Sequence, residues 1–139
     1  MTALPLALVQ GYLKTHFKVL PPEGFTLVAD RHSPELARLH REYGVDCSAF
    51  VTACNPFSDQ LTPELNAERQ SALAEELRRE GFATLEGLGQ HPSNGWPGEP
   101  SFLVLGLSLE ASRLLGIRLG QNAIIWSGSD AVPKLILLR

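Results

Sequence analysis

SAFVTACNP, residues 48–56, is a mostly apolar run with an abrupt end. Residues 48–54 predict a strand. Asn55-Pro56 ends it, because the residue before a proline avoids the helical region and proline cannot donate a hydrogen bond to a sheet. Residues 62–64 (TPE) then supply an N-cap, a proline for the first helical position and an acid for the first turn. They predict a helix over residues 63–80.

The following residues continue the alternation of strands and helices. Apolar runs predict strands over residues 82–89, 101–107 and 122–126, and a segment capped by a serine predicts a helix over 108–119. The order over residues 48–127 is therefore strand, helix, strand, strand, helix, strand, which is the split β-α-β arrangement of ferredoxin-like sheets. We predict an α+β fold with this ferredoxin-like core.

Further elements are expected outside that core. Before it we expect a helix over residues 4–16, a strand over 25–30 and a helix over 34–43, and after it a strand over 132–138. A chain of 139 residues fits one domain, so residues 1–139 are predicted to form a single unit.

Composition and charge exclude several classes of protein. The chain has 44% hydrophobic and 19% charged residues, which is typical of soluble globular proteins. Its net charge of -3 lacks the Lys/Arg excess that binding to duplex nucleic acid requires. No apolar run approaches the ~20 residues of a membrane span, and the first residues do not resemble a secretory signal. We expect a cytoplasmic protein that binds neither membranes nor duplex nucleic acid.

Three polar stretches adjoin the predicted strands, at residues 52–56, 95–101 and 120–123. In the predicted topology all three meet at one edge of the sheet. The start of the helix over 63–80 lies at the same edge and brings unpaired backbone donors. The sequence therefore predicts the functional site at this edge.

The side chains predicted to bind a ligand at this edge are mostly amides, with one acid, one hydroxyl, one guanidinium and one indole. They are Asn55, Asn66, Arg69, Trp96, Glu99, Ser101, Gln121 and Asn122. Such a set suits hydrogen bonding to a small polar metabolite or a nucleotide rather than recognition by charge. Glu99 is the best candidate for a catalytic group, because Gly98 and Pro100 hold it in a stiff loop.

Each of these residues also has a purely structural interpretation. Asn66 falls on the apolar stripe of its helix, where it would tie down the preceding loop by hydrogen bonds. A loop acid such as Glu99 can be solvated, and Gln121-Asn122 can satisfy the free carbonyls at the end of a helix. Arg69 can be an exposed helix residue and Trp96 simple packing area.

Motifs for metals and cofactors are missing from the sequence. The four histidines, His16, His32, His40 and His91, show no ligand spacing beside cysteines or acids. Cys47 and Cys54 match no metal or redox motif and are interpreted as buried apolar residues. Phosphate-binding glycine loops and paired nucleophiles and bases are also missing. We predict no metal and no cofactor, and the sequence leaves open whether the protein is an enzyme.

Four motifs together carry a family resemblance. They are Thr52-Ala53-x-Asn55-Pro56, Asn66 with Leu73 and Leu77, Trp96-Pro97-x-Glu99-x-Ser101-Phe102-Leu103-Val104, and Gly120-Gln121-Asn122-Ala123-Ile124. Over roughly residues 50–138 the chain resembles a bacterial family known only as domain of unknown function 3293. The resemblance supports the grouping of these residues and implies no activity, substrate or cofactor.

Two functional hypotheses follow from the sequence. In the first, the domain binds a small polar ligand at the predicted edge. In the second, the same residues only brace loops, and the protein is an interaction module that pairs through its C-terminal edge strand with a partner or with its own copy. The apolar run at residues 135–138 suits such pairing, so the sequence leaves both monomer and homodimer open.

Overall fold

The computed structural model describes residues 2–139. This part of the chain contains four α-helices: α1 (Leu6–Lys14), α2 (Pro34–Tyr43), α3 (Pro63–Arg79) and α4 (Leu109–Arg118). A 3-10 turn, η1, spans Pro56–Ser58. The strands are β1 (His16–Val19), β2 (Phe25–Leu27), β3 (Ser48–Val51), β4 (Ala83–Gln90), β5 (Glu99–Leu105), β6 (Ala123–Ser127) and β7 (Pro133–Leu137).

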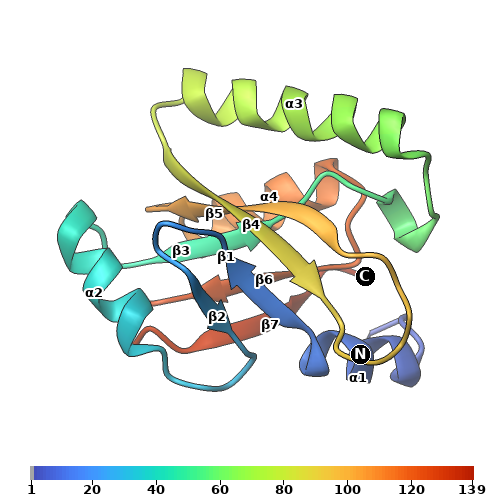
Figure 1. Cartoon of the computed structure of the whole chain (residues 1–139), viewed down its shortest axis with the longest axis horizontal. Helices are drawn as coiled ribbons and strands as arrows, with labels where there is room; N and C mark the ends of the chain where they lie inside the picture. Colours follow the sequence, from blue (N-terminus) through green and yellow to red (C-terminus); the bar gives the residue numbers. More distant parts are fainter. Residues whose placement is uncertain (1) are drawn as a thin grey trace.

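These strands form one antiparallel sheet that curls into half a barrel (Figure 1). Their order is β2-β1-β4-β5-β3-β6-β7, and each neighbouring pair is antiparallel. The curl brings the segment after β2 to the start of β7, where the Asp30 amide donates to the Pro133 carbonyl at 2.7 Å. The Ser33 amide likewise donates to the Ala131 carbonyl at 3.0 Å. These two bonds join the segment that follows edge strand β2 to the start of edge strand β7 and the residues just before it.

Three of the helices start at the side chains that the sequence predicts as caps. Ser33 Oγ accepts from the Leu36 amide, Thr62 Oγ1 from the Leu65 amide and Ser108 Oγ from the Ala111 amide, at 3.1–3.2 Å. Each bond satisfies a backbone donor that the first turn of a helix leaves unpaired. The predicted helices over 34–43, 63–80 and 108–119 are confirmed to within one residue at each end.

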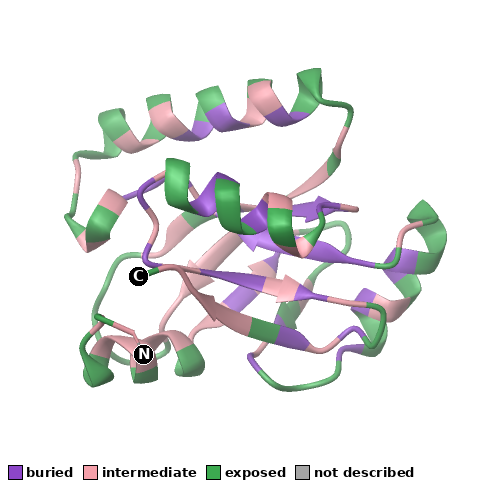
Figure 2. Ribbon diagram, turned by 180° about the vertical axis from the view of Figure 1, so that it is seen from behind, coloured by how far each residue is buried: buried purple, intermediate pink, exposed green. Residues whose placement is uncertain are grey.

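Apolar side chains fill both faces of the sheet. On the convex face, Leu73 and Leu77 of α3 and Leu115 of α4 pack on Val51, Val104 and neighbouring strand residues. On the concave face, a second cluster joins α2 to Phe17, Phe50, Leu103, Ile125 and other side chains of the strands. Figure 2 shows the buried residues on the sheet-facing sides of α3 and α4. In Figure 1, α2 lies at one end of the hollow and α1 at the other.

The predicted ferredoxin-like split β-α-β core is wrong. The structure is a single curled sheet of seven strands with helices on both faces, so residues 48–127 do not form a separate core that carries additions. The prediction failed first at β1, because the predicted helix over 4–16 includes its first residue, His16, and no strand was predicted over residues 17–19. β1 pairs with β4 from His16↔Gln90 to Val19↔Gly87, and it extends the sheet past its predicted edge.

One position of β4 leaves no room for a side chain. A Cβ atom added to Gly87 of β4 would lie 2.6 Å from Cε2 of Phe50 and 2.9 Å from the carbonyl oxygen of Lys18. The Phe50 ring therefore occupies the space above Gly87 inside the hollow, where it also meets the Phe17 ring edge-on at 5.4 Å.

No helix of residues 2–139 is long and apolar enough to cross a membrane.

Candidate functional site

The three polar stretches meet at one end of the sheet. Asn55 follows β3, Glu99 begins β5, and Gln121 lies two residues before the start of β6. The Asn55 Nδ2 atom donates to Glu99 Oε2 at 2.6 Å, and Gln121 Nε2 donates to the Cys54 carbonyl at 3.0 Å. Side chains from all three stretches are therefore joined by direct hydrogen bonds.

A reciprocal pair of amides fixes the direction of the Asn55 side chain. The backbone amide of Asn55 donates to Asn66 Oδ1 at 2.9 Å, and Asn66 Nδ2 donates back to the side-chain oxygen Oδ1 of Asn55 at 2.8 Å. The Leu61 amide also donates to Asn55 Oδ1 at 2.9 Å. Because two donors occupy this oxygen, the amide nitrogen of Asn55 faces the opposite way, toward Glu99. Asn66 thus braces the loop after β3 and orients the group that contacts Glu99.

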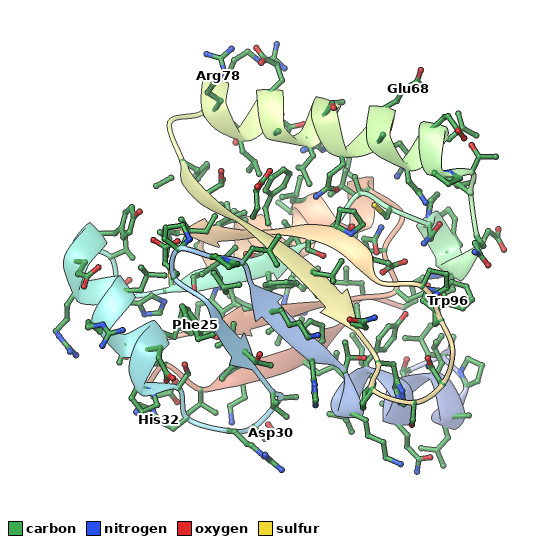
Figure 3. All side chains as sticks on the ribbon, in the orientation of Figure 1. Phe25, Asp30, His32, Glu68, Arg78 and Trp96 are labelled. Atoms are coloured by element: carbon green, nitrogen blue, oxygen red, sulfur yellow. The ribbon has the colours of Figure 1, made fainter. Side chains whose placement is uncertain are left out.

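Glu99 lies in a setting that disfavours its charge. Burial raises the pKa of the Glu99 carboxyl above its ordinary value, and hydrogen bonds from Asn55 and Trp96 oppose that rise only in part. Trp96 itself lies on the loop between β4 and β5, as Figure 3 shows. The carboxyl of Glu99 is therefore the acid at this end of the sheet whose ionisation depends most on its surroundings.

A cavity of about 240 Å³ opens beside Glu99, inside the half barrel and under α1. Its apolar wall comes from the concave face of the sheet, with Phe17, Phe50, Ile125 and Leu135. Its polar wall contains six of the predicted ligand-binding residues: Asn55, Trp96, Glu99, Ser101, Gln121 and Asn122. A pocket with a mainly apolar lining and a few converging polar groups is the usual form of a small-molecule site.

Two predicted residues lie outside the cavity. Asn66 is behind Asn55, as described above, and Arg69 is committed to the backbone. Arg69 Nε donates to the Ala53 carbonyl at 2.6 Å, and its Nη2 donates to the Leu119 carbonyl at 2.7 Å. Arg69 therefore ties the end of β3 to the end of α4. Neither the exposed-helix interpretation nor the predicted ligand-binding role describes it.

Sequence reasoning missed several polar residues of the cavity wall, among them Tyr12 and Ser58. Tyr12 OH and Ser58 Oγ are 3.4 Å apart, and Asn122 Nδ2 donates to Ser58 Oγ at 2.8 Å. Tyr12 belongs to α1 and Ser58 to η1. No local pattern links these two elements, because α1 reaches the site only through the curl of the sheet.

The loop that carries Asn55 has an unusual backbone. Asn55, Phe57 and Ser58 have φ angles of 47°, 58° and 62°, in the left-handed region that residues other than glycine rarely adopt. Strain of this kind persists only where the surroundings hold it, and it is common at functional sites. Here the Phe57 amide donates to the Gly120 carbonyl at 2.7 Å, and the Phe57 ring lies 4.8 Å from the Arg139 guanidinium.

The residues that commonly hold metals lie apart from one another. Within residues 2–139, no three His, Cys, Asp or Glu side chains come close enough together to bind a metal ion. Cys47 and Cys54 are both buried free thiols. Burial raises the pKa of each thiol, which lowers its reactivity as a nucleophile.

Comparison with known proteins identifies a family but no characterised relative. The family model described as "Protein of unknown function (DUF3293)" matches residues 51–124, which include the Asn55, Glu99 and Gln121 stretches. No curated protein and no solved structure matches the chain. The matched region covers more than half of the sequence, and the chain belongs to the DUF3293 family of unknown function.

Proposed function

We propose that the protein binds a small polar metabolite in the half-barrel cavity, with Glu99 as its central polar contact. One observation carries the proposal: a carboxyl group with a raised pKa, oriented by Asn55, lines a cavity whose opposite wall is apolar. Such a group gains most from a ligand that replaces its lost solvation with hydrogen bonds. The cavity volume of about 240 Å³ lies below the 300–1,000 Å³ of drug-sized sites, so the ligand is small.

The charge of the lining favours a metabolite over a nucleotide. Among the described residues that line the cavity none is Lys or Arg, and Glu99 is the only acid. A phosphate would therefore meet a carboxylate without a compensating cation. The nearby Arg69 cannot serve, because its guanidinium is bonded to two backbone carbonyls.

The alternative, an interaction module that pairs through its last strand, has less support. β7 is an edge of the sheet, as that hypothesis requires. Its residues Leu135 and Ile136 are nevertheless half-buried, because they pack against the concave and the convex core respectively and do not form a free apolar strip. Pairing with a second copy remains compatible with ligand binding in the cavity.

A thermal-shift screen against a metabolite library tests the proposal. A ligand present at 100 times its dissociation constant raises the free energy of unfolding by about 2.7 kcal/mol, which corresponds to several degrees in Tm. We expect hits with the wild type that Glu99→Gln loses. Glu68→Gln is the matched control, because Glu68 extends away from the sheet on α3 (Figure 3) and should keep them. Hits of equal size in all three proteins would place binding outside the cavity.

A further inference from the structure

The hydrogen-bonding directions of the cavity wall restrict the ligand further, and this inference rests on the proposed function. Several polar side chains there have already used their donors. Ser101 Oγ donates its only hydrogen to the Glu99 carbonyl at 3.0 Å, and Thr52 Oγ1 donates its own to the Pro100 carbonyl at 2.7 Å. Each hydroxyl can therefore act toward a ligand only as an acceptor.

The Glu99 carboxylate and the neighbouring Gln121 side chain also offer acceptors to a ligand. The Glu99 carboxylate accepts from Asn55 through Oε2 and also from Trp96, and its two oxygens keep further lone pairs for a ligand. Gln121 uses one of its two amide hydrogens to donate to the Cys54 carbonyl, and its Oε1 is an acceptor. The wall beside Glu99 thus presents three kinds of acceptor: a carboxylate, a hydroxyl and an amide oxygen.

The His91 ring supplies a donor to the cavity wall. Its Nδ1 atom accepts from the amides of Ser93 and Asn94, each at 3.0 Å. A nitrogen that accepts two bonds carries no proton, so the ring hydrogen is on Nε2, which is a donor. Despite this donor, Glu99 is the only acid and no residue is Lys or Arg among the described residues of the lining.

We infer that the ligand is a small amine: a nitrogen head group that donates to Glu99, Ser101 and Gln121, attached to an uncharged apolar body that lies on Phe17 and Phe50. The head group donates to these acceptors, and its positive charge is matched by the one carboxylate of the lining. The apolar body covers the aromatic pair at the base of the cavity. A carboxylate or phosphate in the same place would lie beside the Glu99 carboxylate, and no Lys or Arg among the described lining residues would compensate its charge.

Three probes with one apolar body separate the chemical classes: phenethylamine, phenethyl alcohol and phenylacetate. Their binding is followed by proton–nitrogen NMR titration of the wild-type protein. The indole signal of Trp96 reports on the cavity, whereas that of Trp126, whose Nε1 donates to the Leu107 carbonyl, is the internal control. We expect phenethylamine to bind about tenfold or more tightly than either other probe, because hydrogen bonds to charged groups are worth more than neutral ones.

Variants of two acids complete the test. Glu99→Gln keeps the shape of the side chain and should remove the preference for the amine, whereas Glu68→Gln should retain it. Equal or tighter binding of phenylacetate at the Trp96 signal would overturn the amine inference and leave the cavity as a binding site. An amine preference that persists in Glu99→Gln would also overturn the inference. Failure of all three probes and of the metabolite library to shift the Trp96 signal would overturn the proposed function itself.

Discussion

Glu99 owes its properties to residues that the sequence places far from it. The side-chain amide of Asn55 points toward this carboxylate because Asn66, eleven residues further on, and the Leu61 backbone amide both donate to its oxygen, while Asn66 Oδ1 also accepts from the Asn55 backbone amide. Helical spacing could predict that Asn66 faces the core, and the structural interpretation of Asn66 as a brace agrees with the observed bonds. The orientation that this brace gives to Asn55 depends on the left-handed backbone at Asn55, which no sequence pattern indicates.

The raised pKa of Glu99 predicts how stability depends on pH. Above this pKa the carboxyl is ionised in both the folded and the unfolded protein, and the cost of burying the charge is present in full. As pH falls through the raised pKa toward the ordinary value of 4.5, the folded protein binds a proton before the unfolded one does, so the contribution of Glu99 becomes more favourable.

Glu99→Gln removes this titration while keeping an oxygen that can accept from Asn55. We expect the variant to be more stable than the wild type at neutral pH, and the difference to shrink as pH falls toward 4.5. Urea denaturation of the wild type, Glu99→Gln and the control Glu68→Gln across this range measures it. A difference that is constant with pH would mean that Glu99 titrates as an ordinary exposed acid.

At the scale of single elements, local signals were sufficient for helices and insufficient for short strands. The caps Ser33, Thr62 and Ser108 are local in sequence and act locally, so the helices that they begin could be predicted. β1 has four residues and directly follows α1, with no turn signal between them. Its pairing with β4 is a long-range contact, which no local pattern predicts.

Replacing glycine by alanine is expected to change the free energy of unfolding in opposite directions at two positions. Gly11→Ala places a methyl group within α1, where nothing lies within 4 Å of it, and should raise the free energy of unfolding by about 0.5–1 kcal/mol. Gly87→Ala places a methyl group 2.6 Å from the Phe50 ring and should lower it by about 1–3 kcal/mol. Chemical denaturation compares the pair directly. Equal stability of Gly87→Ala and the wild type would show that the ring does not pack over β4.

For the whole molecule, sequence reasoning found which residues gather but assigned them the wrong architecture. Asn55, Glu99 and Gln121 follow or precede strands at the same end of the sheet, and that grouping did not require the full topology. Predicting the cavity did require the full topology, because β1, β7 and α1 form part of the cavity wall. The sequence therefore predicted the polar half of the candidate site and missed most of its apolar half.

The central claim is that the half-barrel cavity binds a small molecule. The most direct measurement is a map of amide chemical shifts on adding the strongest hit from the metabolite screen. The account predicts shifts concentrated at residues of the cavity wall on three strands, such as Gly89, Ser101 and Ala123. Shifts confined to the outer edge of β7 and the exposed face of α4, at Ile136 and Ile117, would contradict it.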